Sequence, residues 1–187
     1  GEIDGKNIEM EGNDVTREKS YKGAHLHGVS KTYDKDTGNL ISEENFKYGV
    51  HHGQSIFYNS KTGQKTHEEN YKDGKKYGKF TYYDETGKLL REVNYHDDKI
   101  DGKYCEYYSG GGLKLEQEFQ FDKKEGVARE YYEDGTLKSE NRYRDDKKHG
   151  PQLAYYKSGE IMSKQFYDFG EKKGDAIFYD PDGNPVE

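Results

Sequence analysis

The feature that most constrains this chain is a short internal repeat, because a sequence built from copies of one unit folds as a stack of like units. A glycine opens each copy, and successive opening glycines are 25, 25, 24, 24, 24 and 24 residues apart. We call them the anchor glycines: Gly28, Gly53, Gly78, Gly102, Gly126, Gly150 and Gly174. So regular a spacing predicts tandem copies of one supersecondary unit.

A tyrosine stands five residues after every anchor glycine. These column tyrosines are Tyr33, Tyr58, Tyr83, Tyr107, Tyr131, Tyr155 and Tyr179. A residue shared by all copies is typical of a position that stacks one copy on the next, and a tyrosine ring can bury a large apolar area. We therefore expect the column tyrosines to form the structural core of the repeat.

Each copy has the pattern of a β-hairpin. Gly78–Tyr83 is short and rich in aromatic and β-branched residues, a second glycine such as Gly87 marks a turn, and Leu89–Tyr95 resumes an extended pattern. Leu89 and Tyr95 are an even number of residues apart, which places them on one face of a strand, whereas Glu92 between them falls on the other. A loop over residues 97–102 then leads to the next copy.

The repeat predicts an all-β fold, an elongated single-layer antiparallel β-meander built from tandem hairpins. Residues 1–12 match the repeat poorly and are expected to form an N-terminal cap or an irregular segment. Residues 13–187 are expected to form the array, with a degenerate first copy at 13–27 and copies starting at residues 28, 53, 78, 102, 126, 150 and 174. No segment has sustained helical periodicity, so we expect little helix.

Composition limits the kind of core that the array can have. Leu, Ile, Val and Phe together make up about one residue in six, whereas 36% of residues are charged and the net charge is −7. Such a chain would ordinarily be disordered, but 19 tyrosines supply large rings with polar tips. The acidic balance disfavours nucleic acid as a partner, and no apolar stretch reaches the roughly 20 residues of a membrane span.

Three blocks of the sequence carry a family resemblance: GKKYGKFTYYDETGKLLREVNY, GVAREYYEDGTLKSENRY and GPQLAYYKSGEIMSKQFY. Their glycines, paired aromatics, Gly-x-Leu and following Glu and Tyr resemble the MORN-repeat variant of bacterial proteins, including YwqK-family antitoxins. The resemblance implies a β-meander that works by protein interaction and, in some members, neutralises a toxin. The chain departs from the eukaryotic MORN pattern in having no tryptophan, so no phospholipid binding is carried over.

Aromatic residues next to the column tyrosines, together with the nearby Phe80 and Tyr104, are the candidate binding site. They should point to the face opposite the column tyrosines, where aromatic rings suit a protein interface. The candidate aromatic strip consists of Phe80, Tyr82, Tyr104, Tyr108, Tyr132 and Tyr156. Acidic side chains at its rim would favour a basic partner. The alternative is that these rings simply cover the second face of the sheet.

Other site chemistry has weaker support in the sequence. His25, His27, His51 and His52 lie in consecutive copies of one loop, but without the ligand spacing of a closed zinc site. Cys105 shares its column with Ile56 and similar residues, which indicates packing rather than nucleophilic chemistry. We therefore expect no catalytic residues, no metal site and no cofactor.

These patterns favour a non-enzymatic protein-interaction or scaffold protein, with an antitoxin or immunity-type partner of a toxin as one form. The alternative is a bacterial cell-envelope or secreted surface protein that binds a host or envelope ligand. The first implies the cytoplasm, and the second implies the periplasm or cell surface after removal of an N-terminal leader, with which Gly1 in place of Met is compatible. Homo-oligomerisation through edge strands is a further expectation.

Overall fold

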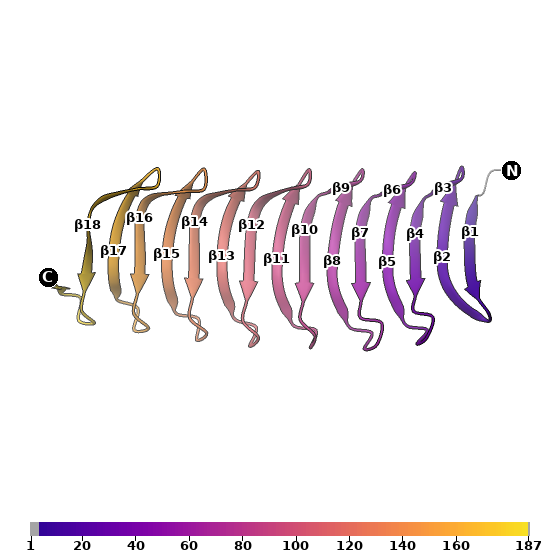
Figure 1. Ribbon diagram of the computed structural model, residues 1–187, viewed down its shortest axis with the longest axis horizontal. Helices are drawn as coiled ribbons and strands as arrows, with labels where there is room; N and C mark the ends of the chain where they lie inside the picture. The colour runs from indigo at the N-terminus through magenta and orange to yellow at the C-terminus, as the bar shows by residue number, and fades with distance from the viewer. Residues whose placement is uncertain (1–3, 187) are drawn as a thin grey trace. The chain divides into compact units, whose positions relative to one another are not determined.

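The computed structural model describes residues 4–186, which contain nineteen β-strands and no helix (Figure 1). The all-β class and the antiparallel meander predicted from the repeat are confirmed. The chain divides into two compact units, one of residues 1–89 and 95–98, the other of residues 90–94 and 99–187. None of the described residues belongs to a helix that could cross a membrane.

The first unit is a meander of antiparallel strands that pair in chain order. A two-residue strand comes directly before each strand that begins at an anchor glycine. Its strands are β1 (Gly5–Glu11), β2 (Asp14–Lys22), β3 (His25–Leu26), β4 (Gly28–Tyr33), β5 (Leu40–Lys47), β6 (Val50–His51), β7 (Gly53–Tyr58), β8 (Lys65–Lys72), β9 (Lys75–Lys76) and β10 (Gly78–Tyr83). Residues 5–11, where the sequence predicted a cap or an irregular segment, form β1 and pair with β2 from Gly5 opposite Tyr21 to Glu11 opposite Asp14.

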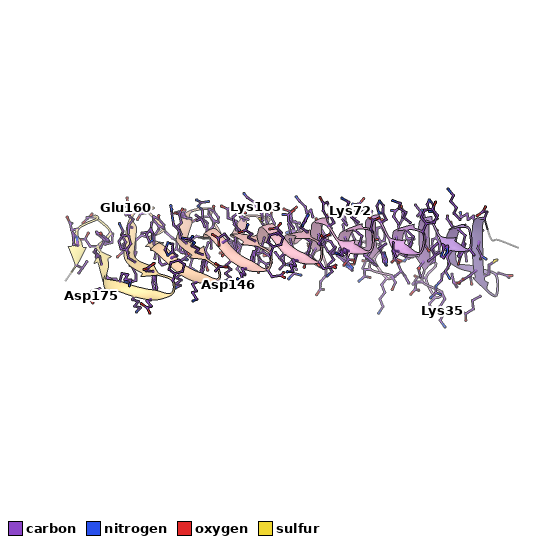
Figure 2. All side chains as sticks on the ribbon, turned by 90° about the horizontal axis from the view of Figure 1, so that it is seen from above. Lys35, Lys72, Lys103, Asp146, Glu160 and Asp175 are labelled. Carbon is purple, nitrogen blue, oxygen red and sulfur yellow. The ribbon has the colours of Figure 1, made fainter. Side chains whose placement is uncertain are left out.

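The second unit is also one layer of antiparallel strands. Strand β11 (Leu89–His96) contributes residues to both units. The strands that follow are β12 (Lys99–Tyr107), β13 (Leu113–Gln120), β14 (Lys123–Tyr131), β15 (Leu137–Arg144), β16 (Lys147–Tyr155), β17 (Ile161–Asp168), β18 (Glu171–Tyr179) and β19 (Pro185–Val186). Within each unit, side chains project from both faces of the strands (Figure 2).

The segments before the anchor glycines are mostly strand rather than loop, which corrects the expectation for residues 97–102. A two-residue turn with two positive φ angles, such as Asp145 (49°) and Asp146 (66°), joins each second strand to the next copy. These angles define a type I′ turn, whose twist matches that of the flanking strands. The chain therefore re-enters a strand at Lys147, three residues before the anchor Gly150.

The anchor glycine lies in a β-bulge. In the pairing of β13 with β14, the register shifts between Gln117 opposite Ala128 and Phe119 opposite Lys124. Gly126 lies in this shift with a φ of 71°, and a Cβ there would lie 3.6 Å from the Cβ of Glu118. A bulge residue with positive φ accounts for the glycine in every copy, because other residues adopt this conformation only at a cost.

The two faces of the second unit differ in chemistry. We call the face that carries Glu116 the glutamate face, and the face that carries Leu115, Gln117 and Phe119 the aromatic face. The most buried side chains of this unit are in the middle of the aromatic face and include Gln117 and Ala128. The separation of the Glu column from the aliphatic and aromatic columns, predicted from odd and even spacing, is confirmed.

The turns also bind one copy to the next. The Asp122 amide donates to the Ile100 carbonyl at 2.8 Å, and the Ile100 amide donates to Asp122 Oδ1 at 2.7 Å. Asp146 makes the same pair of bonds with Lys124, at 3.0 and 2.8 Å. This two-bond clasp explains why aspartate occupies a turn position with positive φ, where glycine would be less strained.

We predict that Asp122→Ala lowers the free energy of unfolding by about 2–3 kcal/mol, because it removes a bond to a charged acceptor and leaves alanine with positive φ. Asp122→Asn is the matched control: it keeps an acceptor and tolerates this conformation, so its loss should stay below about 1 kcal/mol. Urea-induced unfolding measures both. Equal losses for the two variants would show that the clasp does not stabilise the turn.

Candidate interaction surfaces

A ladder of Tyr–Glu hydrogen bonds joins neighbouring copies on the glutamate face. In the second unit, the Tyr107 hydroxyl donates to Glu92 at 2.9 Å and the Tyr131 hydroxyl donates to Glu116 at 3.0 Å. Within the first unit, Tyr33 bonds to Glu18 and Tyr83 to Glu68 in the same way, each at 3.1 Å. Each of these four column tyrosines thus reaches the glutamate of the preceding copy.

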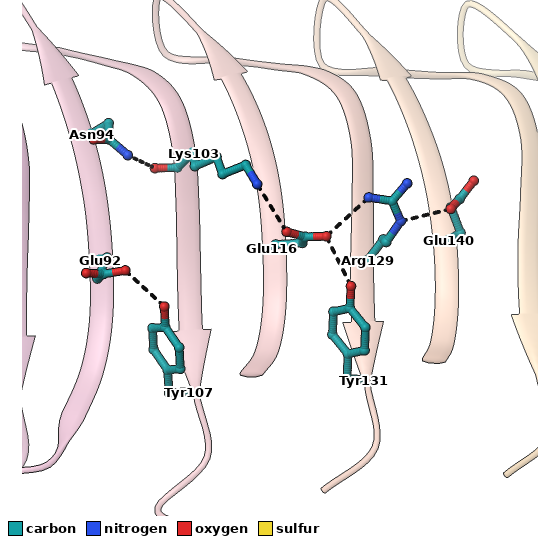
Figure 3. A network of polar contacts seen from close by, with 8 residues as sticks. All are labelled: Glu92, Asn94, Lys103, Tyr107, Glu116, Arg129, Tyr131 and Glu140. Carbon is teal, nitrogen blue, oxygen red and sulfur yellow. Dashed lines mark hydrogen bonds and ion pairs between the residues drawn. The ribbon is translucent and has the colours of Figure 1, made fainter. Parts of the chain in front are cut away.

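Glu116 is the centre of a polar network on this face (Figure 3). Its carboxylate receives the Tyr131 hydroxyl and lies 3.2 Å from Arg129 Nη1 and 3.6 Å from Lys103 Nζ. Arg129 Nε donates in turn to Glu140 at 2.9 Å. Two cations and one phenol therefore surround one carboxylate, an arrangement of charge-assisted hydrogen bonds that favours its ionised form.

The surroundings of Glu116 set its protonation. Partial burial opposes ionisation, but the hydrogen bonds from Arg129 and Tyr131 and the charge of Lys103 outweigh it, so that the pKa of Glu116 lies below its usual value. Burial and the bond to Glu92 raise the pKa of Tyr107. The ladder therefore pairs an ionised carboxylate with a neutral phenol over a wide range of pH.

The column tyrosines are not the buried core that the sequence predicted. They lie on the glutamate face and are half-buried. The buried apolar side chains among residues 4–186 are instead Phe80, Val93 and Ala128. A residue that is the same in every copy is expected to contact the neighbouring copy. The sequence does not show whether that contact is made by a buried ring or by the hydroxyl at the end of the ring.

The candidate aromatic strip divides into three columns: Phe80 and Tyr104 lie two residues after their anchor glycines, Tyr82 lies four after, and Tyr108, Tyr132 and Tyr156 lie six after. Tyr108, Tyr132 and Tyr156 follow the column tyrosine and begin the turn, where other copies have Asp or Asn. Their hydroxyls donate to the carbonyl of the next copy's column tyrosine: Tyr108 to Tyr131 at 2.7 Å, Tyr132 to Tyr155 at 3.1 Å and Tyr156 to Tyr179 at 2.8 Å. The three rings are half-buried, and each is fixed by the backbone at its Cβ end and by the hydrogen bond of its hydroxyl at the other end.

The other strip residues lie elsewhere. Phe80 has no exposed surface and packs against Tyr71 and Tyr95, so the expectation of an exposed ring is wrong for this residue. In the first unit, Tyr82 is half-buried and stacked on His67, with ring centroids 6.0 Å apart. In the second, Tyr104 is half-buried and bonds to Glu106.

The histidine loops and Cys105 offer no catalytic or metal-binding arrangement in the part of the chain that the structure describes. No three His, Cys, Asp or Glu side chains among residues 4–186 gather as metal ligands would. Cys105 is half-buried, and burial together with the carboxylates of Glu92 and Glu116 raises the pKa of its thiol. The thiol therefore stays protonated at neutral pH, in an environment unlike that of a reactive cysteine.

Two residues that sequence reasoning missed stand on the glutamate face. Lys164 occupies the position that Glu116 and Glu140 occupy in the preceding copies, and Phe166 that of Glu118 and Arg142. The signal was present in the sequence, because both residues depart from their columns. A search for residues shared between copies does not find Lys164 and Phe166, because these two residues differ from those of the other copies.

The ladder predicts unequal effects of removing tyrosine hydroxyls. Tyr107→Phe should lower the free energy of unfolding by about 1–2 kcal/mol, because it leaves Glu92 without a phenol donor. Tyr179→Phe should cost less than about 0.5 kcal/mol, because Lys164 stands where its acceptor would be. Chemical unfolding of the two variants provides the test, and equal losses would refute the ladder's role.

The lowered pKa of Glu116 predicts a loss of stability in acid. Since its folded-state pKa lies below the unfolded value of about 4.3, its contribution is present above that pH and is lost as pH falls through the folded pKa. Glu116→Gln should have a lower melting temperature than the parent at pH 7, and the gap should narrow below about pH 4. A gap that stays constant across this range would contradict the prediction.

Comparison with known proteins agrees with the repeat in part of the chain. The family model of the MORN repeat variant matches residues 76–97, 124–145 and 148–168. No curated protein matches the chain. Repeats of this family are a non-catalytic type and are generally associated with protein or membrane binding. These three segments of the chain are thus similar to the MORN repeat variant.

Proposed function

We propose that this protein is a non-enzymatic interaction module that binds a protein partner through the exposed surface of its repeats. The observation that carries the proposal is that the repeated side chains satisfy one another across copies. Tyr131 bonds to Glu116, Asp122 clasps Ile100, and Tyr132 reaches the Tyr155 carbonyl. A surface held in this way is pre-organised, so a partner that binds it pays little ordering entropy.

Within the second unit, the row formed by Tyr108, Tyr132 and Tyr156 is the part of the aromatic strip that best suits such a role. The rings are half-buried and their hydroxyls are fixed, so they present aromatic area with little freedom to lose. Exposed carboxylates of Glu133 and Asp134 lie in the turn that Tyr132 begins. This combination favours a partner with basic residues around an apolar contact.

The identity of the partner distinguishes two more specific versions of this proposal. A toxin-neutralising or immunity-type role is supported by the resemblance to YwqK-family antitoxins, and an envelope or surface role is its alternative. A captured partner that arrests growth when expressed alone, and is relieved by co-expression of this chain, would establish the first. A partner from the envelope fraction without such toxicity would favour the second.

Capture of the partner from the source lysate, followed by binding measurements with variants, tests the proposed surface. Replacing Tyr108, Tyr132 and Tyr156 by Ser should abolish binding, whereas replacing them by Phe should retain most of it, because Phe keeps the ring area. Circular dichroism checks that each variant remains folded.

A second variant keeps the three tyrosine rings of the row and reverses the charge of the turn beside Tyr132. Glu133→Lys combined with Asp134→Lys should weaken binding of a basic partner by about tenfold and reduce its salt dependence. Unchanged binding in both this variant and a folded Ser variant would exclude the row as the site.

A further inference from the structure

The glutamate face changes character in its last two copies. A glutamate occupies one column in six copies, but the seventh has Lys164; the six are Glu18, Glu43, Glu68, Glu92, Glu116 and Glu140. Two residues further along the same strand, the polar residues of the other copies give way to Phe166. Agreement between copies is explained by stacking, so adjacent departures of this kind indicate a role beyond it.

Replacing the glutamate leaves hydrogen-bond donors without an acceptor. Where Glu116 accepts from Tyr131 and faces Lys103 and Arg129, the equivalent position holds Lys164, next to Ile177 of β18 and two positions from Tyr179. Within residues 4–186, the Tyr179 hydroxyl has no hydrogen-bond partner and the Lys164 ammonium has no ion pair; Lys164 Nζ lies 4.7 Å from the centre of the Phe166 ring.

The nearest carboxylate of the preceding copy is already engaged. Glu140 lies opposite Leu153, the neighbour of Lys164, but it receives Arg129 Nε at 2.9 Å and lies 3.6 Å from Arg142 Nη2. Among the described residues, the end of the array therefore presents a cation without an ion pair and a phenol without a hydrogen-bond partner on the neighbouring strands β17 and β18.

Apolar side chains surround these donors. Leu153 and Ile177 lie directly opposite Lys164 on the two neighbouring strands, and Pro151 lies opposite Phe166. Phe166 is 42% exposed and Ile177 is 44% exposed. Exposed apolar residues around a polar centre are typical of a protein-binding site rather than of a solvated face.

We propose that this patch, formed by Pro151, Leu153, Lys164, Phe166, Ile177 and Tyr179, binds a peptide segment in which an acidic side chain is flanked by apolar residues. The partner's carboxylate pairs with the Lys164 ammonium, and the Tyr179 hydroxyl is a second donor for the bound segment. Its apolar neighbours cover Phe166 and Ile177. This site lies on the opposite face from Phe119 and does not depend on the row of turn tyrosines proposed above.

The repeat itself supplies a variant that removes the site without harming the fold. Lys164→Glu with Phe166→Asn restores residues that other copies carry, so it should leave the melting temperature unchanged or raise it. Lys148→Glu with Phe178→Asn is the matched control. It makes the same two changes at Lys148, which lies over Tyr167, and at the exposed Phe178, opposite Ser163 on the aromatic face.

The probe is a blocked, fluorescein-labelled synthetic peptide of alternating Leu and Asp, compared with the same peptide carrying Asn in place of Asp. Fluorescence anisotropy with the full chain should show saturable binding of the Asp peptide and at least about tenfold weaker binding of the Asn peptide, as expected for loss of a charge-assisted bond. The Lys164→Glu/Phe166→Asn variant should lose binding by a similar factor, and the control variant should keep it.

Absence of binding by the parent chain, unchanged binding by the Lys164→Glu/Phe166→Asn variant, or an equal loss in the control variant would each overturn the proposal. Sedimentation of the parent and of the Lys164→Glu/Phe166→Asn variant tests whether the patch instead binds a second copy of this chain. Self-association that the variant abolishes would assign the patch to that copy and would also overturn the proposal.

Discussion

The stability of this fold depends on hydrogen bonds from each copy to its neighbour, because a single layer of strands buries very little. Phe80, Val93 and Ala128 are the only buried apolar side chains among residues 4–186. A conventional core would bury many more, since apolar burial is the main favourable contribution to folding. Here three sets of side-chain bonds recur between copies: tyrosine to glutamate, turn aspartate to backbone, and turn tyrosine to carbonyl.

These three kinds of bond also determine which positions remain free to vary. The column tyrosine, the glutamate and the turn aspartate satisfy polar groups of an adjacent copy, and losing one partner leaves the other unsatisfied. A departure within these columns, such as Lys164 in place of the glutamate with Phe166 two residues further along, therefore carries information about function that Tyr131 and Glu116 do not.

Much of the fold follows from the sequence because its signals are local. The two glycines of each copy report positive φ angles, and the spacing of Leu89, Glu92 and Tyr95 reports the alternation of a strand. Hairpins, their order and the two faces could therefore be predicted. The turn before each anchor glycine was predicted too long because the bulge at residues such as Gly126 resembles loop sequence.

The placement of the site residues could not be predicted in the same way, because it depends on the neighbouring copy. The sequence shows that Tyr107 recurs, but not that its hydroxyl reaches Glu92 rather than a buried core. It shows Phe80 three residues before one column tyrosine and Tyr108 directly after another, but not that the first is buried and the second begins a turn. Burial and partner choice are set by contacts between residues about one repeat apart.

Native-state hydrogen exchange of the backbone amides in the second unit tests most directly whether copies stabilise one another. If each copy depends on its neighbours, a copy with one neighbour opens more easily than a copy with two. We predict that the free energy of opening falls stepwise from β13 toward β18, and that the amides of Asp122, Asp146 and Gly170, which donate to the preceding copy, follow this gradient. A single opening free energy shared by all protected amides, from β13 to β18, would contradict this dependence.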